Sequence, residues 1–192
     1  MSTPTGQRDL IEILVHDHRE VEELFAKFEA TTDPERRQDI SEAVITELVR
    51  HSVAEEQYLY PTARKALPDG DQIAEHEIAE HAEAERDMKT IEALEPTDPE
   101  FGRLFLKLAA EIRHHVQDEE TDLFPRLRSA CSAEDLTELG KKAEMVKKIS
   151  PTRPHPSAPD RPPANKVLGP LAGLVDRVRD AVSDRKTSPD EV

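Results

Sequence analysis

The sequence of 192 residues has no tryptophan, one cysteine, six glycines and only 4% aromatic residues. A single thiol, Cys131, excludes an internal disulfide and a metal site built from several cysteines. A core with so few aromatics and 36% apolar residues suits helices packed through Leu, Ile, Val and Ala, and no long sheet is expected. We therefore expect an all-α protein with one domain and an appendage.

Long apolar runs and an excess of positive charge are also missing. No 18 consecutive apolar residues occur and the N-terminus has no apolar signal segment, so neither membrane spanning nor secretion is expected. Asp and Glu outnumber Lys and Arg by 41 to 26, which gives a formal net charge of −15. This charge would repel phosphate backbones and anionic lipid, so nucleic acid and membranes are not expected partners. With the lone cysteine, these features favour a cytoplasmic location.

What the sequence does have is a stretch of eleven residues that occurs twice. Residues 51–61 read HSVAEEQYLYP, and residues 115–125, 64 positions later, read HVQDEETDLFP. Each copy is His-x-x-x-Glu-Glu followed by Leu-aromatic-Pro. On a helix four residues turn the chain by about 400°, so the His and the first Glu lie within about 40° of each other on one face. An imidazole and a carboxylate therefore converge in each copy.

The repeat extends upstream, where Thr-Asp-Pro-Glu occurs at 32–35 and 97–100 and a single histidine, His18 or His81, precedes each long copy. Such self-similarity pairs two helical hairpins. Apolar residues at three- and four-residue steps predict four helices. The first covers residues 9–30, and the second begins at Pro34 and continues until Pro61 ends or kinks it. The third follows a turn at 68–71, and the fourth begins at Pro99. Short loops between antiparallel neighbours predict an up-down-up-down four-helix bundle.

Three segments follow the bundle. Ser132 and Asp135 resemble a capping box for a short fifth helix ending near Ile149, so residues 1–149 are expected to form the bundle domain. Six prolines between positions 151 and 163 predict a Pro-rich linker over 150–166 that is not a packed element. Residues 167–192 are expected to form a C-terminal amphipathic helix and tail. The apolar face of that helix must pack on the bundle, on a protein partner or on a second copy of the chain.

Six polar residues interrupt the apolar stripes at equivalent depth in the two hairpins. They are His18, His51, Glu55, His81, His115 and Glu119. The simplest alternative is that all six residues lie on solvated helix faces. That explanation is reasonable for a single histidine but less so for six residues at matched positions of a repeat. Burying unpaired ions costs several kcal/mol each, and a metal site offsets that cost because it gives every group a partner. The pattern therefore predicts a metal site in the bundle core.

The number and type of these ligands limit the metal. Four imidazoles and two carboxylates exceed what tetrahedral zinc needs, and calcium sites do not use four histidines. Two octahedral ions accommodate the set if each takes two histidines, one oxygen from each of Glu55 and Glu119, and a bridging oxo or hydroxo group. Mixed ligation of this kind suits iron, with manganese second. The even distribution predicts two near-equivalent irons, each with one open position.

Two further residues are candidates for the same site. Glu77 lies four positions before His81, on the same helix face. Three roles are open for it: a seventh metal ligand, an acceptor for an imidazole N–H, or a solvated side chain. Tyr58 lies two turns beyond His51 and either reaches the site or is a core residue with a satisfied hydroxyl. The four other histidines fall off the site-facing phase or in the expected linker: His16, His76, His114 and His155.

These motifs resemble the hemerythrin-like, or HHE cation-binding, domains. The resemblance rests on His18 in Asp-His-Arg-Glu-Val, on the two His-x-x-x-Glu motifs before Leu-Tyr-Pro and Leu-Phe-Pro, and on His81 in Glu-His-Ala-Glu, and it covers residues 8 to 130. It implies a four-helix bundle around a non-haem di-iron centre that meets oxygen, peroxide or nitric oxide.

The sequence departs from the oxygen-carrying members of that family at two places. Those members have a His-x-x-x-His pair on the third helix, where Glu77 stands here, and a longer His-x-x-x-x-Asp spacing on the fourth. Both departures argue against reversible oxygen carriage, so we expect catalase-like or other peroxide turnover in redox or iron defence. The alternatives are a module that senses oxygen, iron or nitric oxide through its C-terminal helix, and a metal-stabilised structural bundle. The sequence singles out no catalytic side chain.

Overall fold

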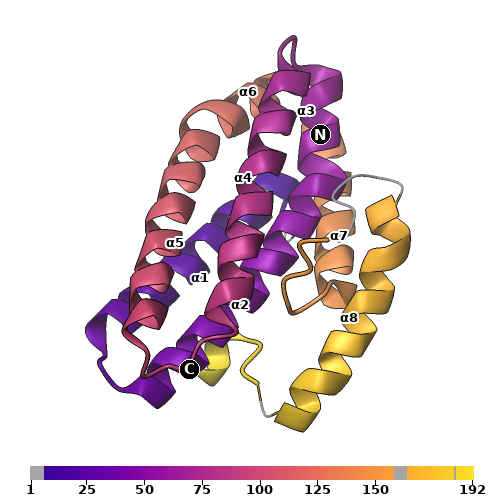
Figure 1. Ribbon diagram of the computed structural model, residues 1–192. Coiled ribbons are helices and arrows are strands. Elements are labelled where there is room, and N and C mark those ends of the chain that lie inside the picture. The colour runs from indigo at the N-terminus through magenta and orange to yellow at the C-terminus, as the bar shows by residue number, and fades with distance from the viewer. Residues whose placement is uncertain (1–6, 158–163, 184) are drawn as a thin grey trace.

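A computed structural model of the chain describes residues 7–157, 164–183 and 185–192, and these residues contain helices and no strand (Figure 1). Four helical rods form the predicted up-down-up-down bundle. They are α1 (Leu10–Ala30), α2 (Pro34–Ala54) continued by η1 (Glu55–Leu59) and α3 (Tyr60–Ala66), α4 (Gly70–Ile91), and α5 (Pro99–Asp118) continued by η2 (Glu119–Leu123) and α6 (Phe124–Ala130). None of the described helices has both the length and the apolar composition needed to cross a membrane.

The second and fourth rods begin where the sequence repeat provides a cap. Asp33 is the N-cap of α2 and accepts a hydrogen bond from the N–H of Glu35 at 3.2 Å. Asp98 caps α5 in the same way, with the N–H of Glu100 at 2.8 Å. A proline follows each aspartate, where its missing N–H costs nothing. The two rods therefore start at equivalent positions relative to their histidines.

Of the two outcomes expected at Pro61, an end or a kink, the structure excludes the end. The five residues of η1 form a π-helical turn before Pro61, and α3 continues to Ala66. Proline lacks an N–H and its ring clashes with the carbonyl four residues earlier, and the wider i→i+5 pattern accommodates both. Pro125 follows η2 in the same way. Each π turn begins at the first glutamate of the repeat, and π turns are frequent at functional sites.

Two apolar clusters fill the bundle and leave a polar layer between them. The first contains Phe25, Phe28, Leu48, Met88, Phe105 and their neighbours. The second contains Leu14, Leu59, Tyr60, Ile78, Phe124 and their neighbours. Each fully buried Leu, Ile or Phe side chain stabilises the fold by about 1.5–3 kcal/mol. The clusters thus fix the four rods on both sides of the polar layer.

The expected fifth helix is α7 (Ala133–Ile149), which packs across α1 and α2. Its N-cap Ser132 accepts a hydrogen bond from the N–H of Asp135 at 3.1 Å. Leu136 of α7 is buried in the second apolar cluster. A Cβ at Gly140 would lie 2.7 Å from the carbonyl oxygen of Arg8, so a glycine is needed for this close approach.

The segment after α7 is packed where it is described, which corrects the expectation of an unpacked linker. Pro151, Thr152 and Pro154 are buried. Thr152 donates a hydrogen bond to Asp180 of α8 (Ala164–Ser183), and the Nε of Arg153 donates to the Oδ1 of Asp180 at 2.8 Å. The polar groups of the segment thus find partners within the fold. Residues 158–163 of the expected linker lie outside the described part of the chain, and the division at 150 and 166 stays a prediction.

The face that α8 turns to the rest of the protein carries carboxylates. Asp176 and Asp180 are 0% and 5% exposed, while Leu174, Val175 and Val182 are 58%, 58% and 85% exposed. At these three positions the apolar residues therefore do not pack on the bundle. The apolar residues Leu168, Leu171 and Val178 of the same helix lie outside the described side chains. The chain ends in a short turn, η3 (Pro189–Glu191).

We expect truncation after Ile149 to leave a folded bundle that keeps its metal but is less stable by about 1–3 kcal/mol, the cost of unpaired buried polar groups. Glu92 would lose Arg153 and Arg185, and Arg50 would lose the carbonyl of Thr187, which it contacts at 3.0 Å. Urea unfolding and metal analysis of both proteins test this expectation. Loss of the metal would show that the C-terminal region supports the centre.

Candidate metal centre

The polar layer brings the six predicted residues to one place between the two apolar clusters. Each of the four rods supplies one histidine, and η1 and η2 each begin with one of the glutamates. The histidines are 5–6% exposed, and Glu55 and Glu119 are 0% exposed. Such burial excludes the alternative that these six residues lie on solvated faces.

His18, His51, Glu55 and Glu119 form what we name the first half-site. The Nε2 atoms of His18 and His51 are 3.2 Å apart. The Nε2 of His51 lies 3.0 Å from Glu55 Oε1, and the Nε2 of His18 lies 3.5 Å from Glu119 Oε2. Each of the four residues thus offers one atom, and these atoms lie within 4.8 Å of one another. A single cation fits among them.

The second half-site contains His81 and His115 and shares the same two carboxylates. The Nε2 of His81 lies 3.3 Å from Glu55 Oε2, and the Nε2 of His115 lies 3.8 Å from Glu119 Oε2. Glu55 therefore faces the first half-site through Oε1 and the second through Oε2. Glu119 approaches a histidine of each half-site through the same oxygen, Oε2. Both carboxylates thus lie between the two half-sites.

Each of these histidines turns its other ring nitrogen, Nδ1, outward to a carboxylate. The pairs are His18 with Glu120 at 2.8 Å, His51 with Asp17 at 3.2 Å, His81 with Glu56 at 3.4 Å, and His115 with Glu80 at 3.1 Å. A carboxylate that accepts from Nδ1–H fixes the ring so that Nε2 faces inward, and it raises the basicity of Nε2. All four histidines are thus oriented as metal ligands are.

These four outer carboxylates were not among the residues predicted from the sequence, although a signal was present. Glu56 and Glu120 are the second glutamates of the repeated Glu-Glu pairs. Asp17 and Glu80 each stand directly before a histidine of the site. The partners cross between rods, however, so the pairs follow only from the three-dimensional arrangement.

Glu77 is only 6% exposed, which excludes the solvated alternative for this residue. Its Oε2 lies 2.9 Å from His115 Nδ1, which is close enough for an ion pair. This contact does not have the geometry of a hydrogen bond, and Oε2 has no hydrogen-bond partner among the described residues. Glu77, His115 and Glu119 also form a group whose ligand atoms lie close enough to hold an ion. Glu77 therefore remains a candidate seventh ligand or an acceptor for His115.

Tyr60, and not Tyr58, turns its hydroxyl to the centre. The hydroxyl of Tyr60 lies 3.0 Å from His81 Nε2 and donates to Glu55 Oε2 at 3.4 Å, whereas Tyr58 packs beside the second apolar cluster. A π turn uses more residues per turn than an α-helix, so η1 moves the site-facing position further along the chain. Burial, reinforced by the charge of Glu55, raises the pKa of Tyr60 well above its ordinary value, so the phenol keeps its proton.

The four other histidines lie outside the centre. The side chains of His16, His76 and His114 are 49%, 65% and 73% exposed. Each pairs with a carboxylate four residues further along its own helix. His155 pairs with Asp176 of α8, at 2.8 Å.

Burial and opposite charges compete at the centre. Burial opposes the charge of His51, but Glu55 and Asp17 outweigh it and raise the pKa of His51 to about 10. Burial likewise opposes the charge of His81, but Glu55 raises its pKa to about 9. Burial would raise the pKa of Glu55, yet His51 and His81 hold it well below its ordinary value. Burial and then the charge of Glu55 raise the pKa of Glu119. The raised pKa values of His51 and His81 show that the carboxylates favour positive charge beside them, and cations in the same place would supply that charge.

The donor set fits a pair of metal ions. Several inward atoms have no hydrogen-bond partner within the described ranges, among them Glu55 Oε1, both oxygens of Glu119 and His115 Nε2. An unpaired buried polar atom costs about 1–3 kcal/mol, and coordination to a cation removes that cost. Imidazole with carboxylate ligation is the chemistry of iron, manganese and zinc sites, and two half-sites that share two carboxylates suit two ions.

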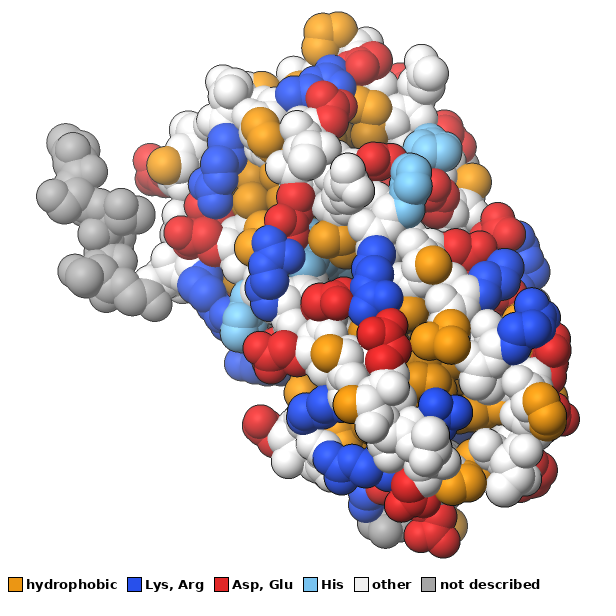
Figure 2. Space-filling model, turned by 90° about the vertical axis from the view of Figure 1, so that its left-hand side faces the viewer, with side chains coloured by type: hydrophobic (Ala, Val, Ile, Leu, Met, Phe, Trp, Pro, Cys, Tyr) orange, Lys and Arg blue, Asp and Glu red, His pale blue; other side chains and the backbone are white. Residues whose placement is uncertain are grey.

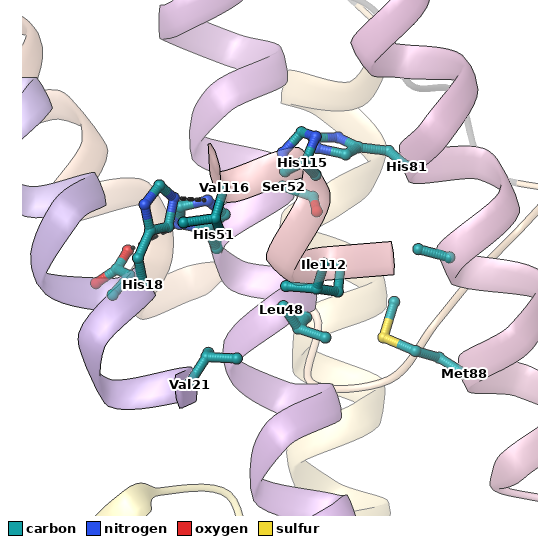
Figure 3. A pocket seen from close by; sticks show the side chains of 12 residues that line it. His18, Val21, Leu48, His51, Ser52, His81, Met88, Ile112, His115 and Val116 are labelled. Atoms are coloured by element: carbon teal, nitrogen blue, oxygen red, sulfur yellow. Dashed lines mark hydrogen bonds and ion pairs between the residues drawn. The ribbon is translucent and has the colours of Figure 1, made fainter. Parts of the chain in front are cut away.

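A small cavity of about 20 Å³ lies beside the histidines (Figure 3). Its walls are His18, His51, His81 and His115 on one side and mainly apolar side chains on the other, among them Val21, Leu48, Met88 and Ile112. A cavity needs roughly 10–15 Å³ of this kind of volume to hold one water molecule. The cavity therefore suits a ligand of one or two heavy atoms.

A surface groove of about 410 Å³ between α4 and α5 reaches the same wall. His81, Ala84, Ile112 and His115 line both the groove and the inner cavity. Figure 2 shows the side of the molecule on which α5 lies, where acidic and basic side chains alternate and apolar side chains lie in hollows between them. The groove brings solvent within one layer of side chains of the centre.

The sequence of this chain is similar to those of known proteins. The family model of the hemerythrin HHE cation binding domain matches residues 9–127. An uncharacterised hemerythrin-like protein of Schizosaccharomyces pombe is 29% identical over 165 residues, which are 85% of this chain and 81% of that protein. A DNA nickase of Nostoc is 32% identical over 123 residues, 64% of this chain but only 34% of that protein.

A solved structure shares the fold. The crystal structure of a hemerythrin HHE cation binding domain-containing protein from Mycobacterium kansasii has a TM-score of 0.63 and 21% identity, covering 73% of this chain and 86% of that one. The family model matches most of the bundle, and the histidines and glutamates of the sequence repeat converge as a cation-binding centre requires. This chain therefore belongs to the hemerythrin HHE cation-binding domain family.

Proposed function

We propose that this chain is a non-haem di-iron protein that turns over peroxide. The observation that supports this most is the position of Glu55 and Glu119, each fully buried and within reach of a histidine from both half-sites. Two shared carboxylates with two imidazoles on each side suit iron better than zinc or calcium. The residues that would hold the irons are His18, His51, Glu55, His81, His115 and Glu119, with Glu77 as a candidate for the second half-site.

When bound, two irons that alternate between the ferrous and the ferric state supply a two-electron redox couple. In disproportionation, one hydrogen peroxide takes up two electrons and two protons and yields two water molecules. A second hydrogen peroxide gives up two electrons and two protons and yields dioxygen. The reaction is balanced and needs no further oxidant or reductant.

The residues of the chain contribute binding, orientation and exclusion of water. The outer carboxylates hold each imidazole with Nε2 inward. The apolar walls of the inner cavity admit a molecule of the size of peroxide and exclude bulk water. Tyr60 keeps its proton beside His81 and is a hydrogen-bond donor to an oxygen atom in the centre.

Metal analysis and peroxide turnover, measured on the same purified sample, test the proposal. We expect about two irons per chain, absorption in the near ultraviolet and visible, and one dioxygen released for every two peroxides consumed, as the balance requires. Samples loaded with manganese or zinc are the matched controls. A colourless, iron-free protein would contradict the di-iron assignment, and a di-iron protein no faster than free iron would contradict the turnover.

A second candidate function is sensing through the C-terminal helix. The exposed Leu174, Val175 and Val182 of α8 favour it, since exposed apolar side chains on one helix are suited to contact with a partner. In that case the same sample would bind iron and react with oxygen, peroxide or nitric oxide, but it would not turn over peroxide. The turnover measurement therefore separates the two candidates.

A further inference from the structure

A lysine of α7, Lys147, contacts one of the outer carboxylates of the metal centre. It lies outside the part of the chain that the family model matches, residues 9–127. The Nζ of Lys147 lies 2.6 Å from Asp17 Oδ1, and Asp17 Oδ2 lies 3.2 Å from the Nδ1 of His51. Asp17 is 3% exposed, and the side chain of Lys147 is 16% exposed. Both oxygens of Asp17 are thus used, one by the lysine and one by a histidine of the first half-site.

The position of Lys147 is itself held from two sides. Its neighbours Ala143 and Val146 are buried in the second apolar cluster, which fixes α7 against the bundle. Its Nζ also lies 3.8 Å from Glu47 Oε2, and Glu47 pairs with Arg50 at 3.0 Å. The ammonium group is therefore fixed by packing and by charge, and it can in turn fix Asp17.

The two half-sites differ in the charges that surround their outer carboxylates. In the first, Asp17 pairs with Lys147, and Glu120 pairs with Arg19. In the second half-site, Glu80 is one of the two outer carboxylates. Its ion-pair partners within the described residues are both histidines, His115 and the exposed His76. Permanent cations thus hold both outer carboxylates of the first half-site.

We propose that Lys147 is a positioning residue for the first half-site, which orients His51 through Asp17 and makes the two metal positions inequivalent. A buried carboxylate that loses one of its two partners no longer has a single preferred orientation, and the ligating imidazole that it holds loses its support. The effect is confined to the first half-site because Asp17 contacts His51 and no histidine of the second. This inference rests on the proposed di-iron function, but it concerns metal binding and not turnover.

Release of iron to a chelator from the full-length, iron-loaded protein tests the inference. In the wild type we expect two phases of one iron each. In Lys147→Met the phase of the first half-site should accelerate about tenfold, the lower end of the effect of losing an outer-shell partner. The other phase should stay within about twofold, since its ligands keep their partners. Mössbauer spectra of the same samples should show a change in one of two iron signals.

Three further variants make the test specific. Lys147→Arg keeps a cation within reach of Asp17 and should restore wild-type release. Lys148→Met removes the next lysine of α7, which is exposed, and should change neither phase. In an Asp17→Asn background, Lys147→Met should add little, because the lysine acts through that carboxylate. If Lys147→Met does not fold, Lys147→Gln replaces it.

Several outcomes would overturn the inference. They are a single release phase in the wild type, equal acceleration of both phases in Lys147→Met, no acceleration, failure of Lys147→Arg to restore release, and additive effects with Asp17→Asn. Failure of the proposed function is separate. A wild type that holds two irons without consuming peroxide contradicts turnover and leaves the role of Lys147 to be read from iron release alone.

Discussion

Glu119→Ala and Glu55→Ala should each lose most of the bound iron, whereas any variant of a single histidine should keep at least one ion. Each glutamate lies near a histidine of both half-sites, while each histidine belongs to one. Removal of either carboxylate therefore weakens both positions and leaves the histidines of both half-sites without a shared negative charge. Iron per chain after loading with excess iron and desalting measures the effect.

The repeat offers matched controls one residue further along the chain. Glu120→Ala and Glu56→Ala remove carboxylates that contact the outer nitrogens of His18 and His81. Loss of such a partner lowers metal affinity by about 10–100-fold, so these variants should still fill at saturating iron. A Glu119→Ala protein with about two irons per chain would refute the bridging arrangement that we propose for this set of ligands.

The fold and the convergence of the six residues were predictable because both depend on short-range rules. Asp33-Pro34 and Asp98-Pro99 set where two rods begin, and from there the helical period places a histidine and a glutamate four residues apart on the inner face. The repeat then makes the two hairpins equivalent. Identification of the six as ligands remains part of the proposed function.

Tyr60 was not predictable from an ideal helix. The helical period carried past Glu55 points to Tyr58, but η1 changes the period at that residue and brings the hydroxyl of Tyr60 to His81. The sequence signal for the change was Pro61, which was interpreted only as an end or a kink. A proline shortly after a predicted ligand is thus also compatible with a π turn.

The face that the C-terminal helix packs against the protein could not be predicted from its sequence pattern. The apolar residues predicted a face that packs on the bundle, on a partner or on a second copy, and in the structure Asp176 and Asp180 are the buried side chains. Asp176 Oδ2 and both oxygens of Asp180 accept hydrogen bonds from Thr152, Arg153 and His155, which lie more than 20 residues earlier in the chain. Burial of a carboxylate depends on such partners, and no local pattern indicates them.

Ala84→Val should lower peroxide turnover by about tenfold to a hundredfold while iron per chain stays unchanged. Ala84 lies in the wall between the groove and the inner cavity, 9% exposed. Two added methyl groups would occupy most of a cavity of about 20 Å³. A displacement of about 1 Å in a reacting molecule can cost a hundredfold in rate, so a peroxide excluded from this position should react slowly.

The same change at Ala110 is the control, because Ala110 lines the outer groove of α5 but not the inner cavity. Both variants carry the lower helix propensity of valine, about 0.6 kcal/mol, so their difference reports the cavity. The opposite change, Ile112→Ala, removes part of the wall and enlarges the cavity. It should admit alkyl hydroperoxides that the wild type excludes. Measurement of kcat/KM for hydrogen peroxide and for an alkyl hydroperoxide in the three variants tests this route. Equal rates in Ala84→Val and Ala110→Val would mean that peroxide reaches the centre by another path.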